Sequence, residues 1–285
     1  VFQQISRIVK LNLNLNLSLL DYIHEVAQMR TFVFVAFSWL FFASVTFAID
    51  EKKLVDMTYP FAGDTLHWPT AKPFSLEKVD EGRTPQGFWY SSYNYSGSEH
   101  VGTHVDAPFH FAEGRWTTDQ IPLGRTIGPG VIIDLKRKAD ASPDYQLQVV
   151  DIHTWERRHG RIPRQAIVLV YSGWGKYWGD RKRYFGTVQP GDVANLHFPG
   201  VSKDAAEFLV KQRTVKAVGI DTPSIDHGPS RDFIAHRVFG DANVPIFENV
   251  AALERLPAKG ATIFAIPMKI KGGSGAPLRI FALLP

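Results

Sequence analysis

The stretch Ala166-Ile-Val-Leu-Val-Tyr171 decides the fold class of this chain. It is short, rich in β-branched residues and bounded by Pro163 on one side and Gly173 on the other, which predicts a largely buried strand. Similar apolar runs recur along the chain, and a final run predicts a closing strand. The further predicted strands cover residues 131–135, 217–220, 262–266 and 279–283.

Helical patterns lie between these runs. In residues 202–212, Ala205, Phe208 and Leu209 share one side of a helix, and Ser202 is placed to cap its N-terminus. Residues 151–158 predict a second, weaker helix. Gly and Pro are spread between all of these elements, without an internal repeat or a shift in composition. Residues 50–285 therefore predict one mixed, β-rich α/β domain, although the alternation is not strict enough to predict a doubly wound sheet.

Composition excludes several classes of protein. With 285 residues, 45% of them hydrophobic, the chain can bury a sizeable core. The net charge of +4 comes from scattered Lys and Arg without an aromatic nucleic-acid signature, so we expect no nucleic-acid partner. The absence of cysteine excludes disulfides, thiolate nucleophiles and zinc–cysteine sites. Any metal site must consist of His, Asp and Glu.

Residues 29–48 have the pattern of a signal peptide. Met29-Arg30 precedes an apolar stretch at 32–42, and small residues lead to Ala48 before a charged segment. The apolar centre is shorter than the ~20 residues of a membrane span. We therefore expect cleavage near Ala48, a secreted or extracytoplasmic protein, and no stable membrane span afterwards. The alternative is an uncleaved anchor that extends to Ile49.

Residues 1–28 precede this pattern and include a Leu-Asn alternation at 11–17. We expect an upstream extension or a gene-model artefact, and the alternative is a targeting extension that masks the signal.

Four potential metal ligands lie in the run His100-Val-Gly-Thr-His104-Val-Asp106-Ala-Pro-Phe-His110. β-Branched residues and Pro108 oppose a helix, and in an extended segment His104 and Asp106 project from the same face. Gly102 lets the backbone bend so that His100 can join them, and Pro108 turns the chain so that His110 approaches from the side. The run predicts a metal site, and the alternative is a chance collection of polar side chains.

Imidazole and carboxylate ligands suit Zn²⁺, Mn²⁺ or Fe²⁺, and catalytic sites commonly use three protein ligands and leave one position for water. Such a cation lowers the pKa of water towards ~7 and polarises a carbonyl group. The helical motif of zincin proteases, with two histidines around a Glu, is absent from the sequence. Two His and one carboxylate also form the triad of non-haem iron oxidoreductases, so that class stays open.

The run resembles the signature of the cyclase-like family of metal-dependent hydrolases, which contains bacterial kynurenine formamidases and isatin hydrolases. Every fixed position of His-x-Gly-Thr-His-x-Asp-x-Pro-x-His is matched. The resemblance implies a single swivelling β/β/α domain, usually in homodimers or homotetramers, and its final glycine-rich segment is closer to the isatin-hydrolase-like branch. It extends through Leu54-Val-Asp-Met-Thr58, Tyr171-Ser-Gly-Trp-Gly175, His197-Phe-Pro-Gly200, Gly219-Ile-Asp-Thr-Pro-Ser224 and Lys271-Gly-Gly-Ser-Gly-Ala-Pro277.

The resemblance also implies roles for individual residues. His100, His104 and Asp106 would bind a first metal ion, and His110 would be the catalytic acid/base. Asp106 would bridge to a second ion held by a His and a Glu twelve residues apart, a pattern that His236 and Glu248 fit. We expect Zn or Mn, with one or two ions per chain.

The implied activity is hydrolysis of an amide in a small, aromatic molecule, either an aryl formamide such as N-formylkynurenine or a cyclic lactam such as isatin. An exported chain fits detoxification or scavenging at least as well as intracellular conversion of tryptophan to kynurenine. A secreted, non-catalytic binding protein on the same scaffold is the alternative. Trp68, Phe88, Trp89 and Trp174 are the candidates for a flat aromatic pocket, and large aromatics in the core are the competing interpretation.

Overall fold

Seven strands close into a barrel in the computed structural model. The sheet order is β1-β12-β11-β5-β7-β9-β10-β4, and a further pairing of β12 with β4 closes the ring. β1 pairs with the far end of β12 as the eighth strand. The strands are β1 (Leu54–Asp56), β4 (His104–Asp106), β5 (Ile127–Asp134), β7 (Ile167–Tyr171), β9 (Ala217–Ile220), β10 (Ile246–Glu248), β11 (Lys259–Pro267) and β12 (Gly275–Leu283).

One part of the barrel is parallel and the rest is antiparallel. β5, β7, β9 and β10 run parallel in that order, whereas β10–β4, β4–β12, β12–β11 and β11–β5 are antiparallel. Parallel neighbours need long crossover connections, and helices supply them. α3 (Lys136–Ala141) and α4 (Val149–His159) join β5 to β7, α6 (Lys203–Phe208) lies between β7 and β9, and α7 (Ile234–Asp241) joins β9 to β10. The mixed α/β, β-rich class is confirmed, and ring closure distinguishes this sheet from a doubly wound one.

The parallel strands are apolar without interruption because both of their faces are buried. Ile167 and Leu169 of β7 face the barrel interior together with Phe247 and Ile263. The alternate residues Val168 and Val170 pack against the helices instead; their cluster includes Ile152 and Trp155 of α4 and Phe239 of α7. The continuous run at 166–171 is thus the signature of a strand between two cores.

The predicted helices form where expected. The Ser202 side chain accepts a hydrogen bond from the Ala205 backbone N–H, which confirms it as the N-cap of α6. The helical turn continues as a π-helix, Leu209–Arg213, and ends at Thr214 in the left-handed conformation. Shorter elements connect the rest: η1 (Glu51–Lys53), η2 (Pro108–His110), η3 (Thr118–Gln120), α2 (Leu123–Thr126), β6 (Gln146–Leu147), η4 (Trp174–Tyr177), α5 (Arg181–Phe185), β8 (Gly200–Val201) and η6 (Leu253–Arg255).

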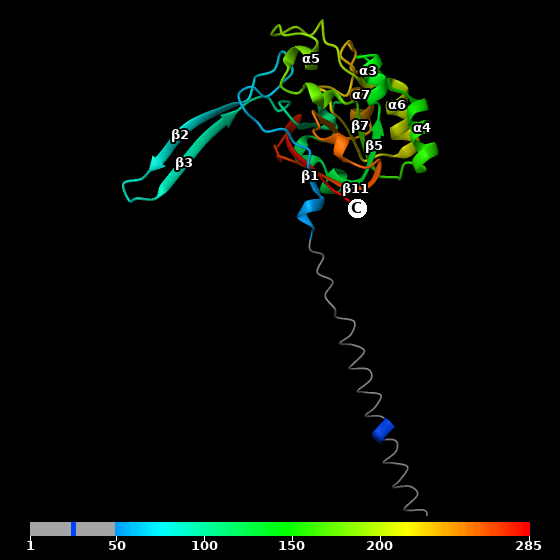
Figure 1. Cartoon of the computed structure of the whole chain (residues 1–285), viewed down its shortest axis with the longest axis horizontal. Coiled ribbons are helices and arrows are strands. Elements are labelled where there is room, and N and C mark those ends of the chain that lie inside the picture. Colours follow the sequence, from blue (N-terminus) through cyan, green and yellow to red (C-terminus); the bar gives the residue numbers. More distant parts are fainter. Residues whose placement is uncertain (1–23, 27–48) are drawn as a thin grey trace, which may run out of the picture. The chain divides into compact units, whose positions relative to one another are not determined.

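A two-stranded hairpin that the sequence did not predict projects from the barrel (Figure 1). β2 (Ser75–Arg83) pairs with β3 (Trp89–Ser96) in an antiparallel register. Nearly all of its residues are exposed, including several large apolar ones. The exposed apolar residues of the hairpin are Leu76, Val79, Phe88, Trp89, Tyr90, Tyr93 and Tyr95.

The structure describes residues 24–26 and 49–285. The chain divides into Val1–Ile49, in which residues 24–26 are helical, and Asp50–Pro285, which holds every strand named above. The predicted signal peptide and upstream extension therefore lie outside the described residues apart from this short helical piece. Within the described part of the chain, no helix has the length and apolarity needed to cross a bilayer.

Candidate functional site

The barrel register brings three acidic and imidazole side chains to one face. β4 places His104 and Asp106 two residues apart on the same side of the strand, as the sequence predicted. In the antiparallel pairing of β4 with β10, Glu248 lies directly opposite His104. On the other edge of β4, Gly275 of β12 lies opposite Asp106, and a Cβ there would lie 2.6 Å from Cε1 of His100. Glycine is therefore required beside the cluster.

Two bends bring the remaining histidines of the run to this face. Gly102 has a φ of 60°, in the left-handed region that glycine adopts without strain, and the turn returns His100 towards Asp106. Pro108 begins the short helix η2, which ends at His110. The His110 ring stacks on that of His100, with ring centroids 4.0 Å apart. Both predicted bends are present.

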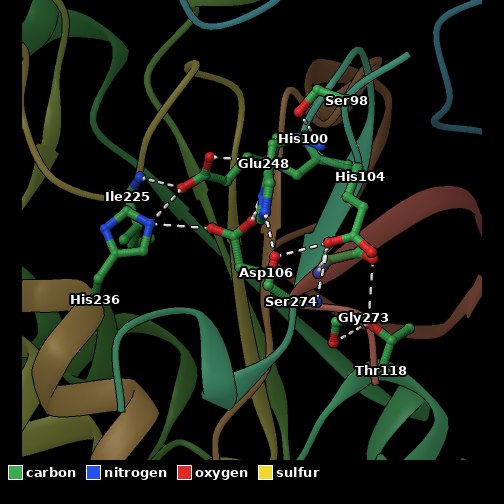
Figure 2. A network of polar contacts seen from close by, with 12 residues as sticks. Ser98, His100, His104, Asp106, Thr118, Ile225, His236, Glu248, Gly273 and Ser274 are labelled. Carbon is green, nitrogen blue, oxygen red and sulfur yellow. Dashed lines mark hydrogen bonds and ion pairs between the residues drawn. The ribbon is translucent and has the colours of Figure 1, made fainter. Parts of the chain in front are cut away.

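Asp106 is the centre of the cluster (Figure 2). Its Oδ1 lies 2.6 Å from His100 Nδ1 and 3.1 Å from His104 Nε2, and its Oδ2 lies 3.0 Å from His236 Nε2. Glu248 lies between the rings of His104 and His236, 3.4 Å from His104 Nε2 and 3.1 Å from His236 Nε2. His104, Asp106, His236 and Glu248 are all buried. The structure thus gathers all five residues named as metal ligands.

The hydrogen bonds of the rings show that this donor set fits a cation. His104 Nδ1 lies 2.8 Å from the Gly102 carbonyl oxygen, which can only accept, so this nitrogen carries a proton. In the neutral ring Nε2 then has a lone pair, and it faces carboxylate oxygens of Asp106 and Glu248, which are also acceptors. Either a second proton or a metal ion must lie between such groups.

His236 repeats this arrangement. Its Nδ1 lies 2.6 Å from Asp226 Oδ2, and Nε2 faces Asp106 and Glu248. A carboxylate behind a ligating histidine is a common way to fix its orientation. Two groups of ligand atoms lie close enough together to hold an ion, namely His104, Asp106 and Glu248, and His100, Asp106 and His110. The second group includes His110, which the sequence placed outside the ligand set.

The metal-free cluster has strongly shifted pKa values. Burial lowers the pKa of His104, but the carboxylates of Asp106 and Glu248 outweigh it and raise this pKa to about 10. The pKa of His236 is raised well above its usual value, because its hydrogen bonds to Asp106, Asp226 and Glu248 outweigh burial. Without a metal ion, protons therefore occupy the positions between the rings and the carboxylates.

His110 shows the opposite shift. Although part of the residue is exposed, desolvation of its ring lowers its pKa to about 4, with the charges of His100 and His236 acting in the same direction and Asp106 opposing them. An unperturbed imidazole has a pKa of ~6.5. The ring is therefore neutral around pH 7 and begins any proton transfer as a base.

Asn249 fixes the position of His104 through a shared contact with the Gly102 carbonyl oxygen. Its Nδ2 donates to the Gly102 carbonyl oxygen at 2.6 Å, the same oxygen that His104 Nδ1 contacts. The Tyr184 hydroxyl lies 2.8 Å from Asn249 Oδ1, and Tyr184 and Asn249 are both buried. This chain fixes the Gly102 turn and the orientation of the His104 ring together. Sequence reasoning missed Asn249, although it directly follows Glu248.

The cluster lines a pocket of about 230 Å³. Trp68 contributes to its wall, as the sequence proposed. Phe111 and Phe233 also line it, and their rings lie 5.1 Å apart. Neither was identified from the sequence, although Phe111 directly follows His110 and Phe233 lies three residues before His236. The remaining lining residues are Ala71, Ser98, His100, His104, Asp106, His110, Pro223, Ser224, His236 and Glu248.

The other three aromatic candidates lie elsewhere. Trp174 is 5% exposed and belongs to a separate core cluster, where its indole N–H donates to the Tyr184 carbonyl oxygen. Phe88 directly precedes β3 and Trp89 begins it, and they are 58% and 62% exposed. These residues do not line the pocket of this chain, which corrects the expectation. The positions of Phe88 and Trp89 shortly before the His100 run did not reveal that they belong to the projecting hairpin.

A larger cavity of about 830 Å³ lies beside α3 and α4. Its lysines are paired with its acids: Lys136 contacts Asp140, and Lys138 contacts Asp151. Neither of the two candidate groups of metal ligands lines it. The smaller pocket is therefore the candidate site.

Comparisons with known proteins agree with this geometry. Residues 55–227 match the family model described as "Putative cyclase". The chain belongs to the cyclase family. It is 34% identical over 195 residues to isatin hydrolase of Roseibium aggregatum, covering 66% of this chain and 72% of that protein. It is 29% identical to kynurenine formamidase of Geobacillus thermodenitrificans, covering 74% of this chain and 88% of that protein.

A solved structure shares the fold of this cyclase-family chain. Isatin hydrolase A from Ralstonia solanacearum superposes with a TM-score of 0.74 at 32% identity, covering 81% of this chain and 92% of that one. The family match ends before His236 and Glu248, so their assignment to the site rests on the contacts described above.

The Asn249→Asp substitution should weaken metal binding by about 10- to 100-fold, because it removes the amide donor to the Gly102 carbonyl oxygen and keeps the side-chain size. Competition with a chromogenic chelator measures this affinity. Asn243→Asp is the matched control, since Asn243 has the same left-handed backbone and its Oδ1 accepts a bond from Trp116 N, which Asp can also accept. Equal affinities for the two variants would contradict the role of Asn249.

The metal-free protein should lose stability as the pH rises from about 6.5 to about 10. The His104 pKa is raised on folding, so its contribution is complete below the unfolded-state pKa near 6.5 and disappears as the pH passes the folded-state value of about 10. Thermal unfolding after chelation measures the change. His104→Gln should flatten this part of the profile, and the same slope in both proteins would contradict the assignment.

Proposed function

We propose that this chain is a metal-dependent hydrolase that cleaves an amide bond in a small, aromatic molecule. The observation that carries the proposal is the buried cluster around Asp106, which opens into a pocket with aromatic walls and has His110 beside it. Ligands, a proton acceptor and a binding surface thus meet in one place. The relatedness to isatin hydrolase and kynurenine formamidase supports the same reaction class.

The residues around Asp106 would hold one or two ions of Zn or Mn. His104, Asp106 and Glu248 form one candidate set, and His236 contacts both carboxylates from the opposite side. His100 contacts Asp106 and would complete the arrangement. A bound ion would lower the pKa of water and polarise the carbonyl group of the substrate.

His110 would move the proton during hydrolysis. Its lowered pKa leaves the ring neutral, so it can accept a proton from the water that adds to the carbonyl carbon. A C–O bond forms, the C–N bond then breaks, and His110 returns the proton to the departing nitrogen. The ring position is fixed by its stacking on His100. Acid and base roles therefore fall to the same imidazole at successive steps.

The pocket walls favour a flat, compact substrate. The rings of Trp68, Phe111 and Phe233 surround a volume of about 230 Å³, below the ~300–1,000 Å³ of typical ligand pockets. An aryl formamide such as N-formylkynurenine and a cyclic lactam such as isatin both place a carbonyl beside an aromatic ring. We propose these two classes as substrates.

At the level of the whole chain, we propose export through the signal peptide at 29–48 and the swivelling β/β/α arrangement that the family resemblance implies. We also propose a homodimer or homotetramer. An isolated two-stranded hairpin is marginally stable in water, and the hairpin of β2 and β3 exposes many large apolar residues. A second copy of this chain would cover them.

His110→Gln should lower kcat by about 10²- to 10⁴-fold while the bound metal is retained, because the substitution removes the proton acceptor and leaves the buried ligands in place. Turnover of N-formylkynurenine and isatin, with metal content from elemental analysis, tests this. His153→Gln on the exposed surface of α4 is the control and should keep wild-type activity. Hydrolysis that survives both chelation and His104→Ala would refute the proposed function.

Replacing Phe88 and Trp89 together with Ser should convert the oligomer to monomers, because it removes exposed apolar surface from the hairpin. Sedimentation velocity at micromolar concentration gives the mass. Val188→Ser is the control, since Val188 is exposed and lies outside the hairpin. A wild-type protein that is monomeric, or a double variant of unchanged mass, would contradict the role of the hairpin.

A further inference from the structure

Residues 222–226, which follow β9, hold the two ligands that are distant from the His100 run. The Ile225 backbone N–H donates to Glu248 Oε1 at 2.7 Å (Figure 2). Asp226 contacts His236 Nδ1 at 2.6 Å and also accepts from the backbone N–H of His236. The segment is itself fixed, because Val201 N donates to the Ile225 carbonyl oxygen at 2.8 Å. Its position is therefore coupled to that of Glu248 and His236.

Ser224 lies in the middle of this segment and lines the pocket. Its carbonyl oxygen accepts a 2.7 Å hydrogen bond from the Thr222 hydroxyl, which holds the backbone in place. The residue is 4% exposed, and its own hydroxyl has no hydrogen-bond partner among the residues that the structure describes. Buried hydroxyl groups are normally bonded, so this one is free to bond a molecule that occupies the pocket.

The other buried polar atoms without a partner in the described part of the chain lie outside this pocket. Thr84 follows β2 in the hairpin, and Asp144 bonds His197 through its second carboxylate oxygen. Neither residue lines the site. Ser224 is therefore the unpartnered hydroxyl that the described residues place beside the metal cluster.

The chemistry of Ser224 limits what it can do. A nucleophilic serine needs a base within hydrogen-bond reach, and the described residues offer none to this hydroxyl. A hydroxyl that keeps its proton can instead donate to an oxygen atom of a bound molecule. Such donors are most effective when they are fixed before the reaction, as the Thr222 bond and the neighbouring Ile225 bond fix this segment.

We propose that the Ser224 hydroxyl donates a hydrogen bond to the carbonyl oxygen of the substrate and stabilises the negative charge that develops there as water adds. This inference rests on the proposed hydrolase function. Ser224 forms no covalent bond and keeps its proton throughout, while His110 carries the proton from water to nitrogen. Ser224 thereby contributes an electrostatic contact from the side of the pocket that also holds Glu248 and His236.

Ser224→Ala in the full, metal-loaded chain tests the proposal. Because the charge appears in the transition state, kcat for isatin or N-formylkynurenine should fall by about 10²- to 10³-fold, with a smaller change in KM. Metal content should equal that of the wild type. Thermal unfolding without substrate should show no loss of stability, since the hydroxyl that is removed has no partner in the protein.

Ser98→Ala is the matched control, because it removes another hydroxyl of the same pocket. Ser98 Oγ accepts a hydrogen bond from the His100 backbone N–H, so this variant should unfold about 2–4 °C below the wild type. If Ser224→Ala shows the same loss, its hydroxyl is bonded within the protein and the proposal is overturned. A Ser224→Ala variant with wild-type kcat overturns it as well.

Failure of the proposed function has a different signature. A wild-type protein that hydrolyses neither compound, with metal bound, contradicts the function itself. In that case the role of Ser224 is tested by calorimetry. The measured quantity is the affinity for isatinate, the acid formed when the lactam ring of isatin opens. Affinity reduced about tenfold or more in Ser224→Ala supports the contact to a bound oxygen atom, whereas equal affinity, or no binding to the wild type, overturns it.

Discussion

The site depends on the contacts between the buried carboxylate of Asp106 and the imidazole rings around it. Asp106 is 2% exposed and contacts three imidazole rings, those of His100, His104 and His236. A carboxylate removed from water is costly unless positive charge lies against it. The neighbouring histidines supply that charge as protons in the metal-free chain, and a divalent cation would supply it in the loaded one. The lowered pKa of Asp106, caused by His100 and His104 against the effect of burial, expresses the same constraint.

The barrel holds this carboxylate where three parts of the sequence meet. β4 is only three residues long, yet it pairs with β10 on one edge and with β12 on the other. The first pairing places Glu248 opposite His104, and the second places Gly275 opposite Asp106. Because side chains alternate along a strand, a slip of one residue in the first pairing would move Glu248 to the opposite face. A slip in the second pairing would replace Gly275, where a Cβ would meet His100. Ring closure and the candidate metal site thus depend on the same short strand.

Two kinds of contact surround the cluster. Polar contacts hold its residues in place, and aromatic side chains line the adjoining pocket. Asn249 and Asp226 fix the rings of His104 and His236 from the protein side. Trp68, Phe111 and Phe233 line the pocket into which the cluster opens. Burial lowers the pKa of His110, so that the ring is neutral around pH 7.

Local sequence alone predicted the apolar strands of the barrel, two of the helices and the potential ligands of the His100 run. Strand β7 can be predicted from the sequence because both of its faces are buried, which makes it apolar throughout. The bends at Gly102 and Pro108 can be predicted because glycine frees the backbone locally and proline restricts it. Family resemblance added His236 and Glu248, which spacing could not have paired. Phe88, Trp89 and Trp174 were assigned to the pocket because they are aromatic, but residue type carries no information on which cluster or projecting hairpin a side chain joins. Closure of the barrel, the walls at Phe111 and Phe233, and the unpartnered hydroxyl of Ser224 were decided only by tertiary structure, because each depends on pairing between segments far apart in the chain.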